Sequence, residues 1–123
     1  MFLNCSNHTS ENWTKEQIAA VHAMGEKTIE DYPFPNVPAD ADEKQLSIIA
    51  EKVCHEILEK KSNVVMCQGE FTLTHKLVNE LMKNGIKVVA ACSERETSEM
   101  VMADGTVRKD SVYKFVRFRE YIL

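Results

Sequence analysis

The sequence predicts an α/β protein with a mainly parallel sheet flanked by helices and an antiparallel hairpin at its carboxyl end. Two apolar runs, Val64–Cys67 and Val88–Cys92, are continuous rather than alternating, which is typical of parallel strands buried on both faces. Between them, apolar residues from Leu73 to Met82 recur at helical spacing, and Asn84-Gly85 supplies a helix stop. Asp104-Gly105 separates two strand-like runs and predicts the hairpin turn.

The amino-terminal part of the chain predicts a strand, a helix and a second strand. Phe2–Cys5 is a short apolar run that ends in a polar cluster. Thr14 and Gln17 form a capping-box pattern, so a helix should begin at Thr14 and run to Gly25. Thr28–Tyr32 is then expected to form the second strand.

A stiff loop and a second helix should follow. Three prolines between positions 33 and 38 forbid regular structure there. Asp40 with Glu43 predicts the cap of a helix whose apolar residues form one stripe. That stripe consists of Leu46, Ile49, Ala50, Val53, Ile57 and Leu58.

The carboxyl-terminal hairpin should pair Thr97–Ala103 with Thr106–Tyr121. The strand before it is expected to end at Cys92, which leaves Ser93–Arg95 in a loop. One face of the last strand combines two arginines with three aromatic residues, and this composition fits either a phosphate and base platform or a protein interface. These residues are Tyr113, Phe115, Arg117, Arg119 and Tyr121. Trp13, by contrast, stands at the spacing of a hydrophobic staple, so we expect it to pack rather than to stack on a base.

Composition restricts the class of protein. A chain of 123 residues with 44% hydrophobic residues is long enough for one core, so residues 1–123 should form a single domain. A net charge of −4 argues against non-specific binding of long nucleic acid. From Gly105 onward, five basic residues against two acidic ones give a local charge of +3. This segment could bind a small anionic ligand or an acidic partner surface, or it could be a solvated edge strand guarded by charges.

Location and metal chemistry can also be anticipated. The chain has no apolar run long enough to span a membrane and no signal-peptide pattern, so we expect a cytoplasmic protein without membrane contact. Its four cysteines show no C-x-x-C spacing, and no His and carboxylate pairs stand at ligand spacing. We therefore expect neither a metal site nor a cofactor.

Polar residues follow each expected strand, and ligands of parallel sheets bind beyond the carboxyl ends of the strands. We therefore expect one polar rim, in which Gly69 permits close backbone approach and His8 is the candidate for acid-base work. Glu70 could be a helix cap or a ligand contact. The rim residues are Ser6, Asn7, His8, Asn36, Gln68, Gly69, Glu70, Thr72, Ser93, Glu94 and Arg95. The chain has neither a dinucleotide fingerprint nor a Walker lysine.

Several segments, in this order and spacing, resemble a known group of proteins. They are F-L-N-C-S-N-H-T, Q-G-E-F-T-L-T-H-K-L-V-N, C-S-E-R, D-G-T-V-R-K and Y-K-F-V-R-F-R-E-Y. The chain is similar to the small stand-alone CRISPR-associated proteins of type III systems, of the Csx group, that include ring nucleases. The resemblance implies a Rossmann-like (CARF-like) homodimer that binds cyclic oligoadenylate and degrades it, which switches off type III CRISPR signalling in antiviral defence.

The expected activity is that of a metal-independent phosphodiesterase acting on cyclic tetra-adenylate, in which each ribose 2′-hydroxyl attacks the adjacent phosphorus. The protein would hold the reacting groups in line and stabilise charge. Arg95 would bind the phosphate, and His8 would assist proton transfer. The ligand-binding residues would be Ser6, Asn7, Gln68, Gly69, Glu70, Phe71, Thr72, Ser93 and Glu94.

Two other functions remain open at this point. The same rim could bind cyclic oligoadenylate without turnover, as a sponge or sensor, or the last strand could make the protein an interaction module. For a homodimer, the two-fold axis is expected near Gln68–Leu73, with Leu77 close by.

Overall fold

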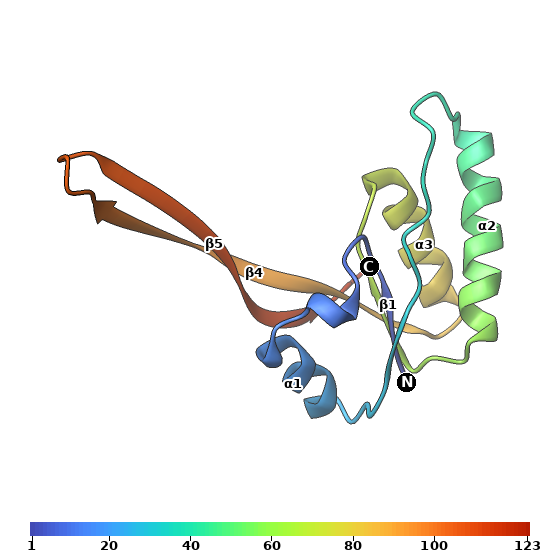
Figure 1. Ribbon diagram of the computed structural model, residues 1–123. Coiled ribbons are helices and arrows are strands. Elements are labelled where there is room, and N and C mark those ends of the chain that lie inside the picture. The colour runs from blue at the N-terminus through green and yellow to red at the C-terminus, as the bar shows by residue number, and fades with distance from the viewer.

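The computed structural model describes residues 1–123 and confirms an α/β fold with a mostly parallel sheet and a carboxyl-terminal antiparallel hairpin (Figure 1). The five strands lie in the order β2-β1-β3-β4-β5, and only β5 runs antiparallel. The strands are β1 (Phe2–Cys5), β2 (Ile29–Asp31), β3 (Val64–Cys67), β4 (Lys87–Val101) and β5 (Val107–Glu120). The helices are α1 (Lys15–Ala23), α2 (Glu43–Glu59) and α3 (Phe71–Lys83), with a short 3₁₀ helix at Ser10–Asn12.

The helices cover the two faces of the sheet unequally (Figure 1). On one face α1 contributes Val21 to a small apolar cluster with Phe2 and Phe118. On the other face α2 and α3 pack together over a larger cluster. All four residues of β1 and all four of β3 are buried, which explains why β3 is apolar without alternation and why Asn4 is the one polar residue of β1.

The direction of the connections changes at β1. From β1 the chain passes through α1 to β2 on one side, and then through α2 to β3 on the other side of β1. This change of direction makes the crevice between the carboxyl ends of β1 and β3 the expected ligand position in a sheet of this kind.

The start of α1 agrees with the sequence, although this helix ends at Ala23 rather than Gly25, and the start of α2 differs. Thr14 caps α1 as expected, because its hydroxyl accepts a hydrogen bond from the Gln17 backbone N–H. The cap of α2, however, is Asp42 rather than Asp40. The carboxylate of Asp42 and the amide of Gln45 close a reciprocal capping box, so the prediction was wrong by two residues.

The fourth strand does not end at Cys92. β4 continues to Val101 and pairs with β5 along its whole outer half, so Ser93, Glu94 and Arg95 lie in a strand and not in a loop. We call residues 93–115 the arm, because this two-stranded ribbon extends away from the helices and the rest of the sheet (Figure 1). Strand β3 ends at Cys67, but β5 alone supplies backbone partners for β4 beyond that point.

A β-bulge at the base of the arm reverses the faces of the last strand. The register shifts between Cys92 and Ser93, which leaves Val116 as the additional residue of β5. As a result, the rings of Phe115 and Phe118 pack together with centroids 5.0 Å apart, although alternation had placed them on opposite faces. The expected single face from Tyr113 to Tyr121 is therefore wrong, because a bulge breaks the two-residue period.

The four cysteines are free, and Cys5, Cys54 and Cys67 are buried in the core. Cys5 and Cys67 stand opposite each other on β1 and β3, and their hydrogen bond together with burial raises the pKa of the Cys67 thiol. In this structure no helix has the length and apolar character that crossing a membrane requires.

Candidate functional site

A cavity of about 340 Å³ lies where the sequence predicts a ligand site, beyond the carboxyl ends of β1 and β3 on the face that carries α1. It extends along β4 to the base of the arm. We call it the crevice. Its lining residues are Ser6, His8, Asn12, Trp13, Thr14, Gln17, Met66, Gln68, Ala91, Ser93, Tyr113 and Phe115. Four expected rim residues, Ser6, His8, Gln68 and Ser93, are thus brought together.

The loop that presents His8 is held from below by two buried polar side chains. The Asn4 amide, with 1% of the residue exposed, donates to the His8 carbonyl at 2.7 Å and to Asp31 at 2.8 Å. The Ser6 hydroxyl lies 2.6 Å from the Asn4 side-chain oxygen, to which it donates. The His8 ring itself is exposed and has no hydrogen-bond partner in the protein. The backbone is therefore fixed while the imidazole stays available.

Gln68 is positioned by the edge of β4. The pairing of β3 with β4 stops at Met66 and Val89, so the next inward N–H of β4, that of Ala91, lacks a strand partner. The Gln68 side-chain oxygen accepts from this N–H at 2.5 Å. The amide nitrogen of Gln68 has no partner in the protein, and two donors remain for the crevice.

Aromatic rings form the walls. Trp13 lies before α1 and packs edge-on against Phe2, with centroids 6.0 Å apart. Tyr113 and Phe115 come from β5. The lining contains no Lys, Arg, Asp or Glu side chain. The crevice is consequently aromatic and polar but formally uncharged, apart from any charge on His8.

Arg95 lies outside the crevice. Its guanidinium group donates to the Ser111 hydroxyl from Nε at 3.1 Å and from Nη2 at 3.0 Å, farther out along the arm. Glu94 belongs to the opposite face of β4 from Ser93, because successive strand residues alternate. Asn7 and Asn36 are exposed and do not line the cavity.

The residues around the start of α3 contact each other rather than the crevice. Gly69 lies against Phe34, and a Cβ atom built on Gly69 would stand 2.4 Å from that ring. The sequence predicts that a ligand approaches the Gly69 backbone closely, but the Phe34 side chain occupies that position. Glu70 caps α3, where the Thr72 hydroxyl and backbone N–H groups hold its pKa below the usual carboxyl range. The cap interpretation of Glu70 is confirmed.

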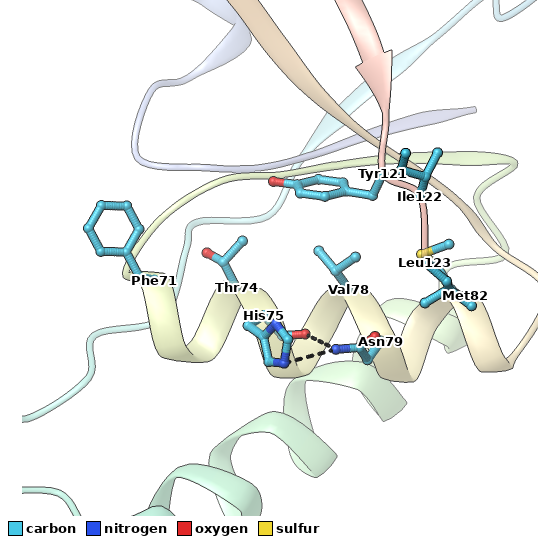
Figure 2. Close-up of a pocket in the computed structure, with 9 residues that line it drawn as sticks. All are labelled: Phe71, Thr74, His75, Val78, Asn79, Met82, Tyr121, Ile122 and Leu123. Atoms are coloured by element: carbon cyan, nitrogen blue, oxygen red, sulfur yellow. Dashed lines mark hydrogen bonds between the residues drawn. The ribbon is translucent and has the colours of Figure 1, made fainter.

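A second cavity, of about 560 Å³, lies between α3 and the carboxyl-terminal segment (Figure 2). Figure 2 shows Phe71 at one end of it, with Tyr121 above the helix. The Tyr121 hydroxyl donates to the Cys67 carbonyl at 2.8 Å, and burial raises the pKa of Tyr121. The Thr74 hydroxyl is buried without a partner. Nothing in the sequence indicated this mainly apolar cavity, because its walls come from segments that are distant along the chain.

Two further observations concern the expected dimer axis and metal binding. Leu73 and Leu77 are fully buried in the core, so neither can contact a partner directly. The expectation that the two-fold axis lies near this segment stays a prediction. No group of three or more His, Cys, Asp or Glu side chains is arranged to hold a metal ion.

No curated protein and no solved structure matches this chain, but a protein-family model does. The model of the uncharacterized protein MJ1673 family matches residues 1–119, a range that includes every residue of the crevice and the whole arm. The chain therefore belongs to the uncharacterized protein MJ1673 family.

Proposed function

We propose that this chain is a Rossmann-like (CARF-like) ring nuclease that binds and cleaves cyclic oligoadenylate, and specifically cyclic tetra-adenylate. It would act in the cytoplasm and switch off type III CRISPR signalling. The observation that carries the proposal is the crevice, where the segments F-L-N-C-S-N-H-T and Q-G-E-F-T-L-T-H-K-L-V-N, which underlie the resemblance, supply Ser6, His8 and Gln68 to one cavity. An unengaged imidazole beside polar side chains suits proton transfer on a bound nucleotide.

The reaction needs no nucleophile from the protein. His8 takes the proton of a ribose 2′-hydroxyl, and the 2′-oxygen forms a bond to the adjacent phosphorus. The bond from phosphorus to the 5′-oxygen breaks, and that oxygen leaves with a proton from solvent. The products are a 2′,3′-cyclic phosphate and a 5′-hydroxyl end. The protein contributes alignment and charge stabilisation.

A homodimer completes the site in this proposal. The crevice, at about 340 Å³, is near the lower limit of small-ligand pockets, roughly 300 to 1,000 Å³, and is too small for a ring of four nucleotides. Two copies related by a two-fold axis match a symmetric ring. Arg95 points along the arm and away from its own crevice. We therefore assign it to the phosphate of the partner's half-site.

The arm also favours a second candidate, a protein-interaction module. A two-stranded ribbon is marginally stable in water by itself, and this one exposes apolar side chains. They include Met100, Val101, Val107, Val112 and Tyr113. The third candidate, binding of cyclic oligoadenylate without turnover, uses the same crevice.

Incubation of the purified protein with labelled cyclic tetra-adenylate, with and without EDTA, separates these three functions. A ring nuclease produces linear products in both conditions. Tight binding without products identifies a sponge or sensor, and neither binding nor products favours the interaction module.

Mixing two inactive variants tests the shared site. His8→Ala and Arg95→Ala should each lose activity by roughly 10²-fold. After subunit exchange of equal amounts, half of the dimers carry one intact site, so about a quarter of wild-type activity should return. If Arg95 acts within its own chain, mixing restores nothing, and the assignment to the partner's half-site is wrong.

A further inference from the structure

The crevice has the composition of a nucleobase site rather than a phosphate site. It contains no lysine or arginine, and Arg95 is directed elsewhere by its contacts with Ser111. A phosphate group placed inside would lose its hydration without gaining a lysine or arginine partner, which is unfavourable. A flat, uncharged ring would meet no such penalty.

The walls are suited to such a ring. Trp13 comes from the segment before α1, whereas Tyr113 and Phe115 come from β5, and the strands β3 and β4 add the apolar residues Met66 and Ala91. Aromatic side chains stack on bases whatever their sequence, because every base has a π face. Tyr113 is 73% exposed, which leaves its ring free to cover a ligand.

Gln68 adds direction to this site. Its oxygen is held by the Ala91 N–H at 2.5 Å, so the amide cannot rotate without breaking that bond. Only the amide N–H donors then face the crevice. A fixed donor recognises an acceptor, and adenine offers acceptors at its unsubstituted ring nitrogens. The Gln68 amide nitrogen is a donor only, so it cannot accept a hydrogen bond from the exocyclic amino group of adenine.

We propose that the crevice binds the adenine base of the ligand, that Gln68 donates a hydrogen bond to a ring nitrogen of that base, and that the phosphates remain outside. Gln68 is thus a specificity-determining residue. The proposal rests on the proposed function for the identity of the ligand. It goes beyond that function by assigning the base, rather than the phosphate, to the pocket.

The single tryptophan of the chain reports on occupancy, because Trp13 lines the crevice. Its fluorescence is titrated with four probes: cyclic tetra-adenylate, adenosine, ribose 5-phosphate and inorganic phosphate. Adenosine and cyclic tetra-adenylate should both bind and compete with each other. Ribose 5-phosphate and phosphate should do neither.

Two substitutions of Gln68 test the donor. Gln68→Glu keeps an oxygen for the Ala91 N–H but replaces the amide donor by a second acceptor, so adenosine affinity should fall tenfold or more. Adenosine is uncharged, and the new carboxylate therefore does not repel it. Gln68→Met removes the donor without adding an opposing acceptor, but it also removes the oxygen that accepts from the Ala91 N–H, so a loss of at least about fivefold should follow, the value expected for one neutral hydrogen bond. Circular dichroism and urea unfolding confirm that both variants fold.

The outcomes separate this inference from the proposed function. If cyclic tetra-adenylate binds while adenosine does not compete, or if Gln68→Glu changes affinity less than twofold, the base assignment is wrong and the function stands. If adenosine binds as described but cyclic tetra-adenylate does not, the base site stands and the proposed function is wrong. If neither binds, both are wrong. Competition by phosphate or ribose 5-phosphate alone would make the crevice a phosphate site.

Discussion

Single residues hold the loops around the crevice in place through contacts that are not with ligand. Gly69 follows the crevice residue Gln68 and lies against the Phe34 ring, which comes from the proline-rich loop. The glycine that had suggested backbone approach to a ligand thus lies against another loop of the protein. Asn4 acts similarly, because its buried amide ties the His8 carbonyl to Asp31 at the end of β2.

Gly69→Ala should therefore destabilise the protein. The new methyl group would stand 2.4 Å from the Phe34 ring, which must move. Overpacking of this kind costs roughly 1 to 3 kcal/mol, measured as the free energy of urea unfolding. In the background Phe34→Leu, which shortens the opposing side chain, the same substitution should cost clearly less. Equal costs in both backgrounds would show that Phe34 is not the obstacle.

Glu26 makes stability depend on pH. Its carboxylate lies 3.0 Å from the amino-terminal ammonium and accepts from Asn63 at 3.2 Å, and these bonds, the ammonium first, lower its pKa. A lowered pKa in the native state means that the stabilisation is complete above the ordinary carboxyl pKa, about 4.3. It is lost as pH falls through the native value.

Glu26→Gln should accordingly reduce the unfolding free energy at pH 7 by about 1.5 to 3 kcal/mol, the range for hydrogen bonds to charged groups. The difference from wild type should shrink toward pH 3. The exposed Glu51→Gln variant provides the control, with a change within about 0.5 kcal/mol at both pH values. A difference for Glu26→Gln that is independent of pH would contradict the ion-pair explanation.

At the scale of elements, helix α2 shows how a local signal is resolved by geometry. Two aspartates precede it, and both stand at a plausible capping distance from the apolar stripe. Asp42 is the one whose backbone is extended and whose carboxylate reaches the N–H of Gln45 at 2.8 Å. Asp40 lies in the preceding turn.

Asp42→Ala should cost about 1 kcal/mol of unfolding free energy, as is typical for loss of an amino-terminal cap. Asp40→Ala is the matched control and should lie within about 0.5 kcal/mol of wild type. Thermal or urea unfolding measures both. A larger loss of unfolding free energy in Asp40→Ala than in Asp42→Ala would identify Asp40 as the cap.

In the molecule as a whole, the arm stands out because little of it packs against the helices and the rest of the sheet. The body packs its helices on both faces of the sheet, whereas the arm has only its own two strands beyond its base, where Phe115 packs against the smaller cluster. Its cross-strand ion pairs, such as Glu99 with Lys109 and Glu96 with Lys114, are exposed and contribute little stability. A partner surface is the simplest source of further support.

Deletion of the arm tests this idea. Residues 96–112 are replaced by Asn-Gly, which can join Arg95 to Tyr113 because these two residues pair across the ribbon. Wild-type protein should sediment as a dimer at micromolar concentration and the deletion variant as a monomer. The variant keeps the crevice walls, so adenosine should still quench Trp13 fluorescence. A deletion variant that remains dimeric would place the interface elsewhere.

Most elements of the body and the general position of the site could be predicted from the order of residues alone. Continuous apolar runs identified β1, β3 and the inner half of β4, and helical spacing identified α3, because each of these signals is local. The order of polar clusters after the strands was enough to place Ser6, His8 and Gln68 at one edge, since parallel strands end at the same edge.

The length of β4 and the residues of β5 that line the crevice depend on the tertiary structure. The Asp104-Gly105 turn predicted that the outer half of β4 pairs with β5, but no local pattern showed that this pairing continues inward to Val89 and joins the two halves of β4 into one strand. The bulge at Val116 reversed the faces of β5, so that Phe115 joined Trp13 in lining the crevice. The extension of β4 beyond Cys92 placed Arg95 in the arm. The inward continuation of the strand pairing thus set the length of β4, and one additional residue set the faces of β5. Residue periodicity predicted neither.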